Sequence, residues 1–431
     1  MRNFMLNKST LKKLFVVFLA FFVIYTPRFS ELFFNIPTEL FEAIIFVCLI
    51  LYTLFVKKIK VSRSILIYFL VVIFASMYFT VIALLSDNPL RIVQNVFILI
   101  KVSNLLLVVK LYGEISGKSG VETLDIFFIT ATLQFVFVLI TLISPSAHRF
   151  ALDLYYLGGP ENQYISRSRI YGVSGDYTFF TPIYHGMLVT LATFLYIFKS
   201  RFTLATFGAL VIFLLTSILT NGRFGLIIAL LGSSVVGLYY VIKNKKYKIF
   251  LLFLIYSVLF LLCITIVLYF LSPYTLRWIY FGFKEVISVF TGNAETTGGS
   301  IGVLINEMIH FPKGLDLIFG AGHRVYGIAL ATSHGLPQSD IGFVNDLYMG
   351  GLIYVSVLYI GSFYVIINRL GINNRILAIA FILILLVANG KGEVMRSGLL
   401  IQSIIVISDI IGDGGNENVG KSFNKYSYSS L

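Results

Sequence analysis

The chain alternates long apolar runs with short polar breaks, and most runs approach the length that spans a bilayer. About 20 helical residues cover the hydrocarbon core of a membrane. The pattern predicts twelve spanning helices, near residues 13–33, 38–56, 64–85, 91–109, 123–143, 177–198, 202–219, 224–242, 249–271, 341–367, 375–389 and 397–411. Pro27 and Arg28 interrupt the first, and the last two are short enough to be partly re-entrant. The predicted fold class is an all-α, polytopic integral membrane protein.

Two connections, residues 144–176 and 272–340, are far longer than the others. Loops longer than about 15 residues usually carry a function or lack order. Within the second, residues 274–290 place apolar side chains at helical spacing, which is typical of a helix lying in the membrane interface. We expect residues 1–412 to form one transmembrane domain, followed by a polar, disordered cytoplasmic tail at 413–431.

Composition and charge support this architecture and give it an orientation. The 431 residues are 58% apolar and 12% charged, against about 25% charged in an average soluble domain, which excludes a soluble fold. With the N-terminus inside, the cytoplasmic segments hold 20 of the 33 Lys and Arg residues. Because basic residues resist translocation, we expect both chain ends in the cytoplasm.

The two predicted sides also differ in the kind of basic residue. The cytoplasmic side is mostly Lys, whereas the outer side has nine Arg and three Lys. A planar guanidinium binds phosphate or carboxylate through two parallel hydrogen bonds, so the excess of Arg favours an anionic ligand outside. The alternative is that interfacial Arg only meets lipid headgroups.

The second long loop ends in a distinctive arrangement of glycines, histidines and acids. It contains Leu317-Ile-Phe-Gly-Ala-Gly-His-Arg-Val-Tyr326, and the next span opens with Ser339-Asp-Ile-Gly-Phe and continues to Gly-Gly at residue 351. The two loop glycines permit a tight turn beside His323 and Arg324, and Asp340 would lie near a helix N-terminus. A lone G-x-G without a preceding strand does not predict a dinucleotide site. No His, Asp or Glu cluster has convincing metal-ligand spacing.

Three stretches resemble the bacterial O-antigen polymerases of the Wzy type, which are related to the O-antigen ligases. The first is Arg169-Ile-Tyr-Gly-Val-Ser-Gly-Asp176, similar to the family's R-x-x-G segment before a span. The second is Thr220-Asn-Gly-Arg223, similar to a small-polar-then-Arg turn in which Ser is common where Gly222 stands. The third is residues 320–351. All three lie outside in the predicted topology.

The resemblance implies a glycosyltransferase C-like helical bundle in the cytoplasmic (inner) membrane, with its active site facing the periplasm. The implied activity joins undecaprenyl-pyrophosphate-linked oligosaccharide repeat units into O-antigen or capsular polysaccharide. These lipid-linked oligosaccharides, membrane lipid and a chain-length regulator protein are the implied partners, and nucleic acid is not. No cofactor or metal is expected, because preorganised Arg can stabilise the departing pyrophosphate.

The resemblance and the residue chemistry together give a set of candidate site residues. The expected substrate-binding residues are Lys101, Arg169, Asp176, Arg223 and Arg324. The acceptor hydroxyl needs a base, for which the second loop offers His323, His334 and Asp340. Histidine has the more suitable intrinsic pKa, and the charge of Arg324 would keep the adjacent His323 neutral. We therefore expect His323 to be the base, with His334 second, and Asp340 to orient a partner or hold Arg.

Lys101 stands apart from the loop residues because it lies inside the fourth predicted span. Its helix face also carries Gln94 and Asn104. An intramembrane charge is a functional candidate by default, and the alternative is a structural pair inside the bundle.

Two other functions stay open. An O-antigen ligase would differ mainly in its acceptor, the lipid A core. A lipid-linked oligosaccharide flippase would also have about twelve spans, but it should show two-half symmetry, midplane charges and short loops. The sequence shows no internal repeat and two long outer loops.

Overall fold

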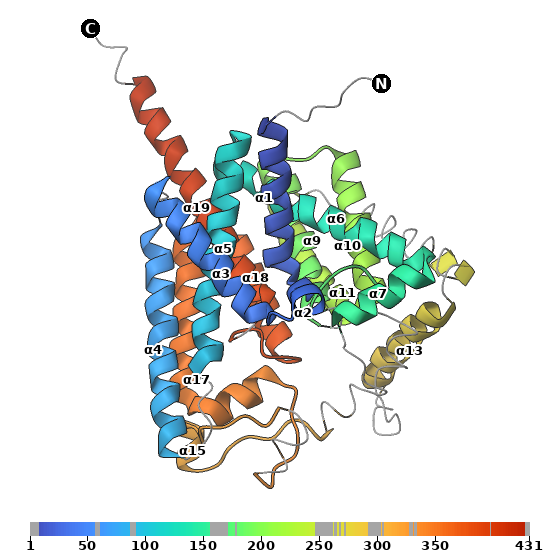
Figure 1. The fold of residues 1–431 in the computed structure, drawn as a ribbon, viewed down its shortest axis with the longest axis vertical. Helices are drawn as coiled ribbons and strands as arrows, with labels where there is room; N and C mark the ends of the chain where they lie inside the picture. The colour runs from blue at the N-terminus through green and yellow to red at the C-terminus, as the bar shows by residue number, and fades with distance from the viewer. Residues whose placement is uncertain are drawn as a thin grey trace.

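The computed structural model describes residues 8–56, 61–86, 92–155, 171–176, 179–245, 262, 265–266, 269–270, 273–291, 303, 306–326, 331, 334–396 and 398–426. Within these residues, helices are the only regular elements (Figure 1). They are α1 Lys8–Tyr25, α2 Phe29–Phe34, α3 Thr38–Phe55, α4 Arg63–Leu85, α5 Ile92–Ser116, η1 Gly120–Leu124, α6 Asp125–Ile143, α7 Pro145–Tyr155, α9 Phe180–Lys199, α10 Leu204–Asn221, α11 Phe224–Asn244, α13 Pro273–Phe290, α15 Leu315–Phe319, α17 Gly342–Leu370, α18 Arg375–Asn389 and α19 Leu399–Tyr426.

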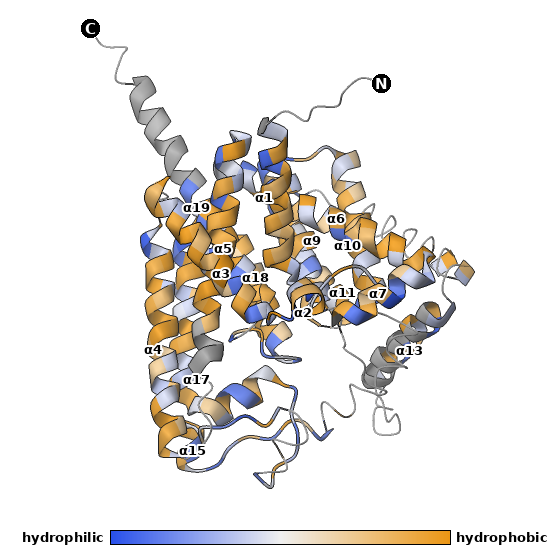
Figure 2. Cartoon of the chain, viewed as in Figure 1, coloured by the Kyte–Doolittle hydropathy of each residue, from blue (hydrophilic) through white to orange (hydrophobic). Residues whose placement is uncertain are grey.

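Among the described residues, seven helical segments are long and apolar enough to cross a membrane. They are α3, α4, η1 with α6, α9, α10, α11 and α17, and α18 is a shorter apolar helix. Figure 2 shows apolar residues along the sides of these helices, as lipid contact requires. The prediction of an all-helical, polytopic membrane protein is confirmed at this level. The ninth predicted span, 249–271, lies mostly outside the described residues.

The first predicted span, 13–33, is two helices in the structure. α1 ends at Tyr25, and Thr26 adopts a left-handed conformation with φ 41°. Pro27 follows, and proline in a helix interior removes a backbone hydrogen bond and clashes with the preceding turn. The chain then restarts as α2 at Phe29. The proline in the sequence therefore marks a real break.

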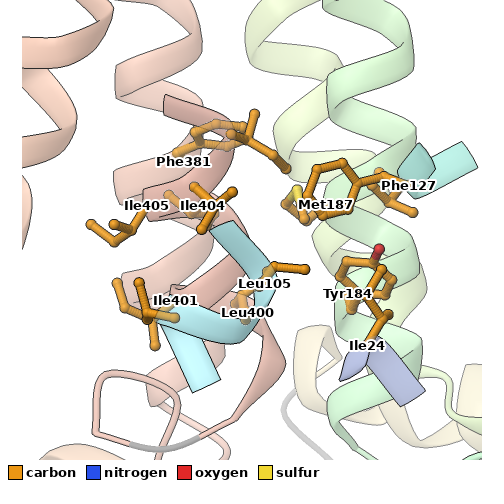
Figure 3. Close-up of a cluster of buried hydrophobic side chains, with 14 of the residues drawn as sticks. Ile24, Leu105, Phe127, Tyr184, Met187, Phe381, Leu400, Ile401, Ile404 and Ile405 are labelled. Atoms are coloured by element: carbon orange, nitrogen blue, oxygen red, sulfur yellow. The ribbon is translucent and has the colours of Figure 1, made fainter. Parts of the chain in front are cut away.

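The centre of the bundle is packed by side chains from six helices. Figure 3 shows Leu105 of α5, Phe127 of α6, Met187 of α9, Phe381 of α18 and Ile404 of α19 in one cluster, with residues of α1 beside them. All five are fully buried. Since lipid tails are as apolar as these side chains, close packing is what holds such helices together.

The two described chain ends lie at the same end of the bundle, and α15 lies at the other (Figure 1). Basic residues of the predicted cytoplasmic loops have acidic partners. Lys118 pairs with Asp125 at 2.5 Å, and Arg201 pairs with Glu122 at 3.0 Å and with Asp125 at 2.9 Å. The two pairs of Arg201 connect η1 and α6 to the segment between α9 and α10.

The last helix is longer than its apolar pattern. The sequence predicts a disordered tail from residue 413, but α19 continues to Tyr426. Arg369 of α17 pairs with Asp409 at 2.9 Å and with Asp413, one helical turn later. This double pairing ties α17 to α19 as far as Asp413.

Candidate functional site

The site begins at a kink in α17, where Gly350 and Gly351 meet Gly320 of the second loop. Gly350 and Gly351 break the helical geometry, and Gly351 has φ 63°. A Cβ at Gly351 would lie 2.3 Å from the carbonyl oxygen of Ile318, and a Cβ at Gly320 would lie 2.3 Å from the Cα of Gly350. The loop and the helix therefore pack backbone against backbone, which only glycine permits.

Side chains after this contact alternate between two sides of the loop. His323 and Val325 face Tyr348, which shares a buried cluster with Val325 and has its ring 5.7 Å from that of His323. Arg324 lies instead beside Tyr326, with the guanidinium 5.0 Å from the ring centroid. The sequence neighbours His323 and Arg324 thus belong to different surroundings.

On the first side, two histidines stack. The rings of His323 and His334 lie 3.8 Å apart with an interplanar angle of 15°. Nδ1 of His323 donates to the carbonyl of Ala321 at 3.1 Å, because a carbonyl can only accept, and Nε2 is therefore the acceptor nitrogen. That Nε2 is buried, and no described residue bonds to it.

The protonation state of His323 follows from these surroundings. Burial lowers its pKa; the bond to Ala321 and the charge of Asp316 oppose this, and the charge of His334 adds to it. The net pKa is below the ordinary value, which favours the neutral form, and burial rather than the charge of Arg324 is the main cause.

On the second side, Arg324 forms a two-point ion pair. Its Nε donates to Oε1 of Glu393 at 2.8 Å, and its second guanidinium nitrogen donates to Oε2. Arg324 is 8% exposed and Glu393 is 6% exposed. A carboxylate therefore occupies the planar donor face that the sequence assigns to a phosphate.

Glu393 is shared with a second arginine. Arg396 pairs with Glu393 and donates through Nε to Asp346 at 3.2 Å. Asp346 also accepts from the hydroxyl of Tyr359 at 2.5 Å. Burial lowers the pKa of Arg396, but the charges of Glu393 and Asp346 raise it above the ordinary value. Two arginines and two carboxylates thus form a buried network without net charge, which is the condition for burying such groups.

The connection between α18 and α19 carries this network and is held by its neighbours. Oδ1 of Asn389 accepts from the N–H groups of Val394 and Met395 at 3.0 and 3.3 Å. A Cβ at Gly342 would lie 2.3 Å from the same oxygen. Glycine at the start of α17 therefore lets Asn389 fix the connection that presents Glu393.

Residues 171–176 form a non-helical segment bound by the bundle. The N–H groups of residues 171–173 donate to Asn221 of α10 at 2.8 Å, and to Thr141 and Gln134 of α6 at 2.8 and 3.1 Å. Irregular backbone between membrane helices is stable only when such groups are satisfied. The polar residues of these helices thus hold the segment in place.

Asp176 ends this segment and caps the start of α9. Its Oδ1 accepts from the N–H groups of Phe179 and Phe180 at 3.1 and 3.2 Å, which satisfies the open end of the helix. The ring of Phe179 lies where a Cβ at Gly392 would be, at 2.3 Å. The segment therefore packs against the α18–α19 connection, next to Glu393.

Tyr326 is the point where the predicted residues meet. Burial raises the pKa of its phenol, the charges of Asp340, Glu393 and Asp176 raise it further, and Arg324 lowers it. Tyr326 is still half exposed. The charges of three carboxylates and one guanidinium thus act on a single accessible aromatic ring.

Three further candidates remain. Arg223 precedes α11, immediately after the turn that follows Asn221. Lys101 of α5 pairs with Glu42 of α3 at 3.6 Å, which is the structural pairing named as its alternative. Arg169 lies outside the described residues.

Sequence reasoning missed Glu393 and Asp346, and it counted Arg396 only as an outer arginine. Asp346 lies in a predicted span, and Glu393 lies in a short connection between two others. The rule that ionisable residues within membrane segments are functional candidates, applied here to Lys101, would have selected Asp346 as well.

Within the described residues, no group of three or more His, Cys, Asp or Glu side chains could hold a metal ion. No protein-family model, no curated protein and no solved structure matches this chain.

Proposed function

We propose that this protein is a membrane glycosyltransferase that polymerises undecaprenyl-pyrophosphate-linked oligosaccharide repeat units at the periplasmic face of the inner membrane. One observation carries the proposal. The three stretches that resemble O-antigen polymerases are joined in space: Asn221 holds Tyr171, and Phe179, just after Asp176, packs on the connection that holds Arg324 through Glu393. Segments that are distant in the sequence thus meet beside the connection that holds Arg324.

The proposal includes the finer topology of twelve spans in a glycosyltransferase C-like bundle. Within the described part of the chain, helices occupy the eleven predicted positions other than 249–271, and the described chain ends lie together, opposite α15 (Figure 1). We place both ends in the cytoplasm and the loops 144–176 and 272–340 in the periplasm. Lys313→Cys should then react with an impermeant maleimide in intact spheroplasts, and Lys245→Cys should not, each in a background without Cys48 and Cys263. The reverse pattern would reject the orientation.

The chemistry is a glycosyl transfer. The hydroxyl oxygen of the acceptor sugar attacks the anomeric carbon of the donor, and the bond from that carbon to the pyrophosphate oxygen breaks. Negative charge grows on the leaving pyrophosphate, where the fixed charge of Arg324 stabilises it. A carboxylate accepts the hydroxyl proton, and we assign this role to Asp340, whose charge acts on the Tyr326 ring that lies over the guanidinium of Arg324. This choice reverses the order expected from intrinsic pKa, in which His323 comes first.

Purified protein with a lipid-linked repeat unit tests the function. Polymerisation predicts a ladder of lipid-linked products that differ by one repeat unit, with free undecaprenyl pyrophosphate released. A ligase would make no ladder, and would transfer glycan only when lipid A core is added. A flippase would move the substrate across a vesicle membrane without forming a bond. Either result would replace the proposal.

A further inference from the structure

The carboxylate of Glu393 is placed between two guanidinium groups, and this sharing has a functional consequence. Its Oε1 accepts from Nε of Arg324 at 2.8 Å, its Oε2 pairs with the same guanidinium, and Arg396 binds it from the other side. An arginine as buried as Arg324 needs a counter-charge whenever no ligand is bound. Glu393 supplies that charge in the geometry a phosphate would use.

We propose that Glu393 is an internal competitor for the anion site of Arg324, which the donor's pyrophosphate displaces when it binds. This inference rests on the proposed function for the identity of the anion. Arg396 makes the exchange feasible, because it keeps a partner for Glu393 after Arg324 has turned to the ligand. Glu393 is a positioning residue: it acts on substrate through Arg324 and keeps that side chain oriented in the empty site.

The neighbouring groups fit this exchange. Asp346 binds Arg396 and accepts from Tyr359, so it can hold Arg396 in place during the exchange. The ring of the half-exposed Tyr326 lies over the guanidinium of Arg324, so an accessible side chain borders the buried ion pair. If the pair of Arg324 and Glu393 were only structural, removal of the Glu393 charge would not strengthen pyrophosphate binding. If the pair exchanges with the ligand, removal of that charge strengthens pyrophosphate binding.

Binding of inorganic pyrophosphate to the purified full-length protein in nanodiscs, measured by calorimetry, separates the two. Glu393→Gln keeps the side-chain shape and removes the competing charge, so it should bind pyrophosphate about 10-fold more tightly than the wild type. Asp346→Asn is the matched control, since it removes the other carboxylate of the network but not the competitor. It should not tighten binding.

A double variant tests whether the gain passes through Arg324. Glu393→Gln combined with Arg324→Gln should lose the tight binding. In turnover assays, Glu393→Gln should lower KM for the lipid-linked repeat unit and also lower kcat, because the diphosphate product leaves more slowly. If Glu393→Gln unfolds, Glu393→Asp is used, since its shorter side chain keeps the charge but weakens the two-point contact. It should tighten binding to a smaller extent.

The outcomes separate this inference from the proposed function. If Glu393→Gln and Glu393→Asp bind pyrophosphate no more tightly than a polymerising wild type, the exchange is rejected and the function stands. If neither the wild type nor Glu393→Gln binds pyrophosphate, the exchange is also rejected. If the wild type forms no glycan ladder but Glu393→Gln tightens pyrophosphate binding through Arg324, the exchange stands and the polymerase assignment falls.

Discussion

Asn221 binds both backbone groups of Tyr171, fifty residues earlier in the chain. Its Oδ1 accepts from the N–H of Tyr171 at 2.8 Å, and its Nδ2 donates to the carbonyl of Tyr171 at 3.0 Å. Only an amide side chain offers a donor and an acceptor in this arrangement. The end of α10 is thereby joined to the segment that leads to Asp176.

The first prediction tests this contact with Asn221→Asp, which is nearly isosteric. The aspartate keeps an acceptor for the N–H but sets a second oxygen against the carbonyl of Tyr171, inside a fully buried site. A buried carbonyl without a donor, together with a buried charge, should lower the free energy of unfolding by about 2–4 kcal/mol. Thermal and denaturant unfolding, followed by circular dichroism in detergent, measure it.

The control is Asn244→Asp at the end of α11, where the amide donates to the carbonyl of Tyr240 in an exposed position. Water can satisfy that carbonyl, so stability should change little. Equal losses of unfolding free energy in both variants would mean that the contact of Asn221 with Tyr171 contributes no more to stability than the exposed contact of Asn244.

The second prediction concerns the buried charge network. Arg396→Gln removes the guanidinium that pairs with both Asp346 and Glu393. Breaking a buried pair from one side costs about 3–5 kcal/mol, because an uncompensated charge remains. Arg277→Gln on the exposed face of α13 should cost less than about 0.5 kcal/mol. Comparable unfolding midpoints for the two variants would contradict the importance of the network.

The third prediction concerns the kink in α17. In Gly351→Ala the new methyl would meet the carbonyl of Ile318 at 2.3 Å while φ is 63°. Strain of this kind costs about 1–3 kcal/mol, and it should also move the loop that carries Arg324, so product chains should shorten. Gly237→Ala has no heavy atom within 4 Å of the new methyl in α11 and should stabilise by about 0.5–1 kcal/mol. Unchanged lengths of the product chains in Gly351→Ala would show that the geometry of the kink does not affect polymerisation.

The fourth prediction follows from the lowered pKa of His323. Above the ordinary pKa of about 6.5, neither the folded nor the unfolded histidine is protonated, so its contribution to stability is constant. Below that value, the unfolded chain takes up a proton that burial keeps from the folded protein. Stability is therefore lost as the pH falls toward the folded-state pKa. Between about pH 7.5 and 5.5, His323→Gln should lose less unfolding free energy than the wild type.

His310 provides the internal reference for this experiment. Burial also lowers its pKa, although a bond with the backbone of Pro337 opposes the shift. It is present in both proteins, so the difference between them isolates His323. Parallel pH profiles for His323→Gln and the wild type would show that His323 is not the titrating group.

The sequence predicted the helices well because apolar length and turn residues are local signals. Pro27 marked the break after α1, and Gly320, expected to permit a tight turn, has a positive φ of 90° in the structure. The partner of Arg324 could not be found this way. Glu393 lies 69 residues away, and nothing in the local pattern of the α18–α19 connection indicates which arginine it meets.

Adjacency in the sequence was also a poor guide to the site. His323 and Arg324 are neighbours, but their side chains point to opposite sides of the loop, which the loop's glycine pattern does not determine. The pairing of Lys101 with Glu42 could be expected in outline, because a charge inside a span needs a partner. Helix boundaries are determined by residues close in the sequence, whereas the pairing of charged side chains depends on how the whole bundle packs.

The last prediction decides which group accepts the proton of the acceptor sugar. His323 is neutral, and its Nε2 is bonded to no described residue, but it faces Tyr348 and the ring of His334. The charge of Asp340 acts on Tyr326, whose ring lies 5.0 Å from the guanidinium of Arg324. Since a base must be within reach of the hydroxyl that attacks next to the leaving pyrophosphate, Asp340→Asn should reduce kcat by about 100-fold or more, with little change in KM. His323→Gln should change kcat by less than about 10-fold, because its side chain lies on the other side of the loop. Steady-state turnover with a lipid-linked repeat unit measures both, and circular dichroism confirms that both variants fold. A large loss of kcat in His323→Gln with normal turnover in Asp340→Asn would return the role of base to His323, and would require the loop to reorient around Gly322 when substrate binds.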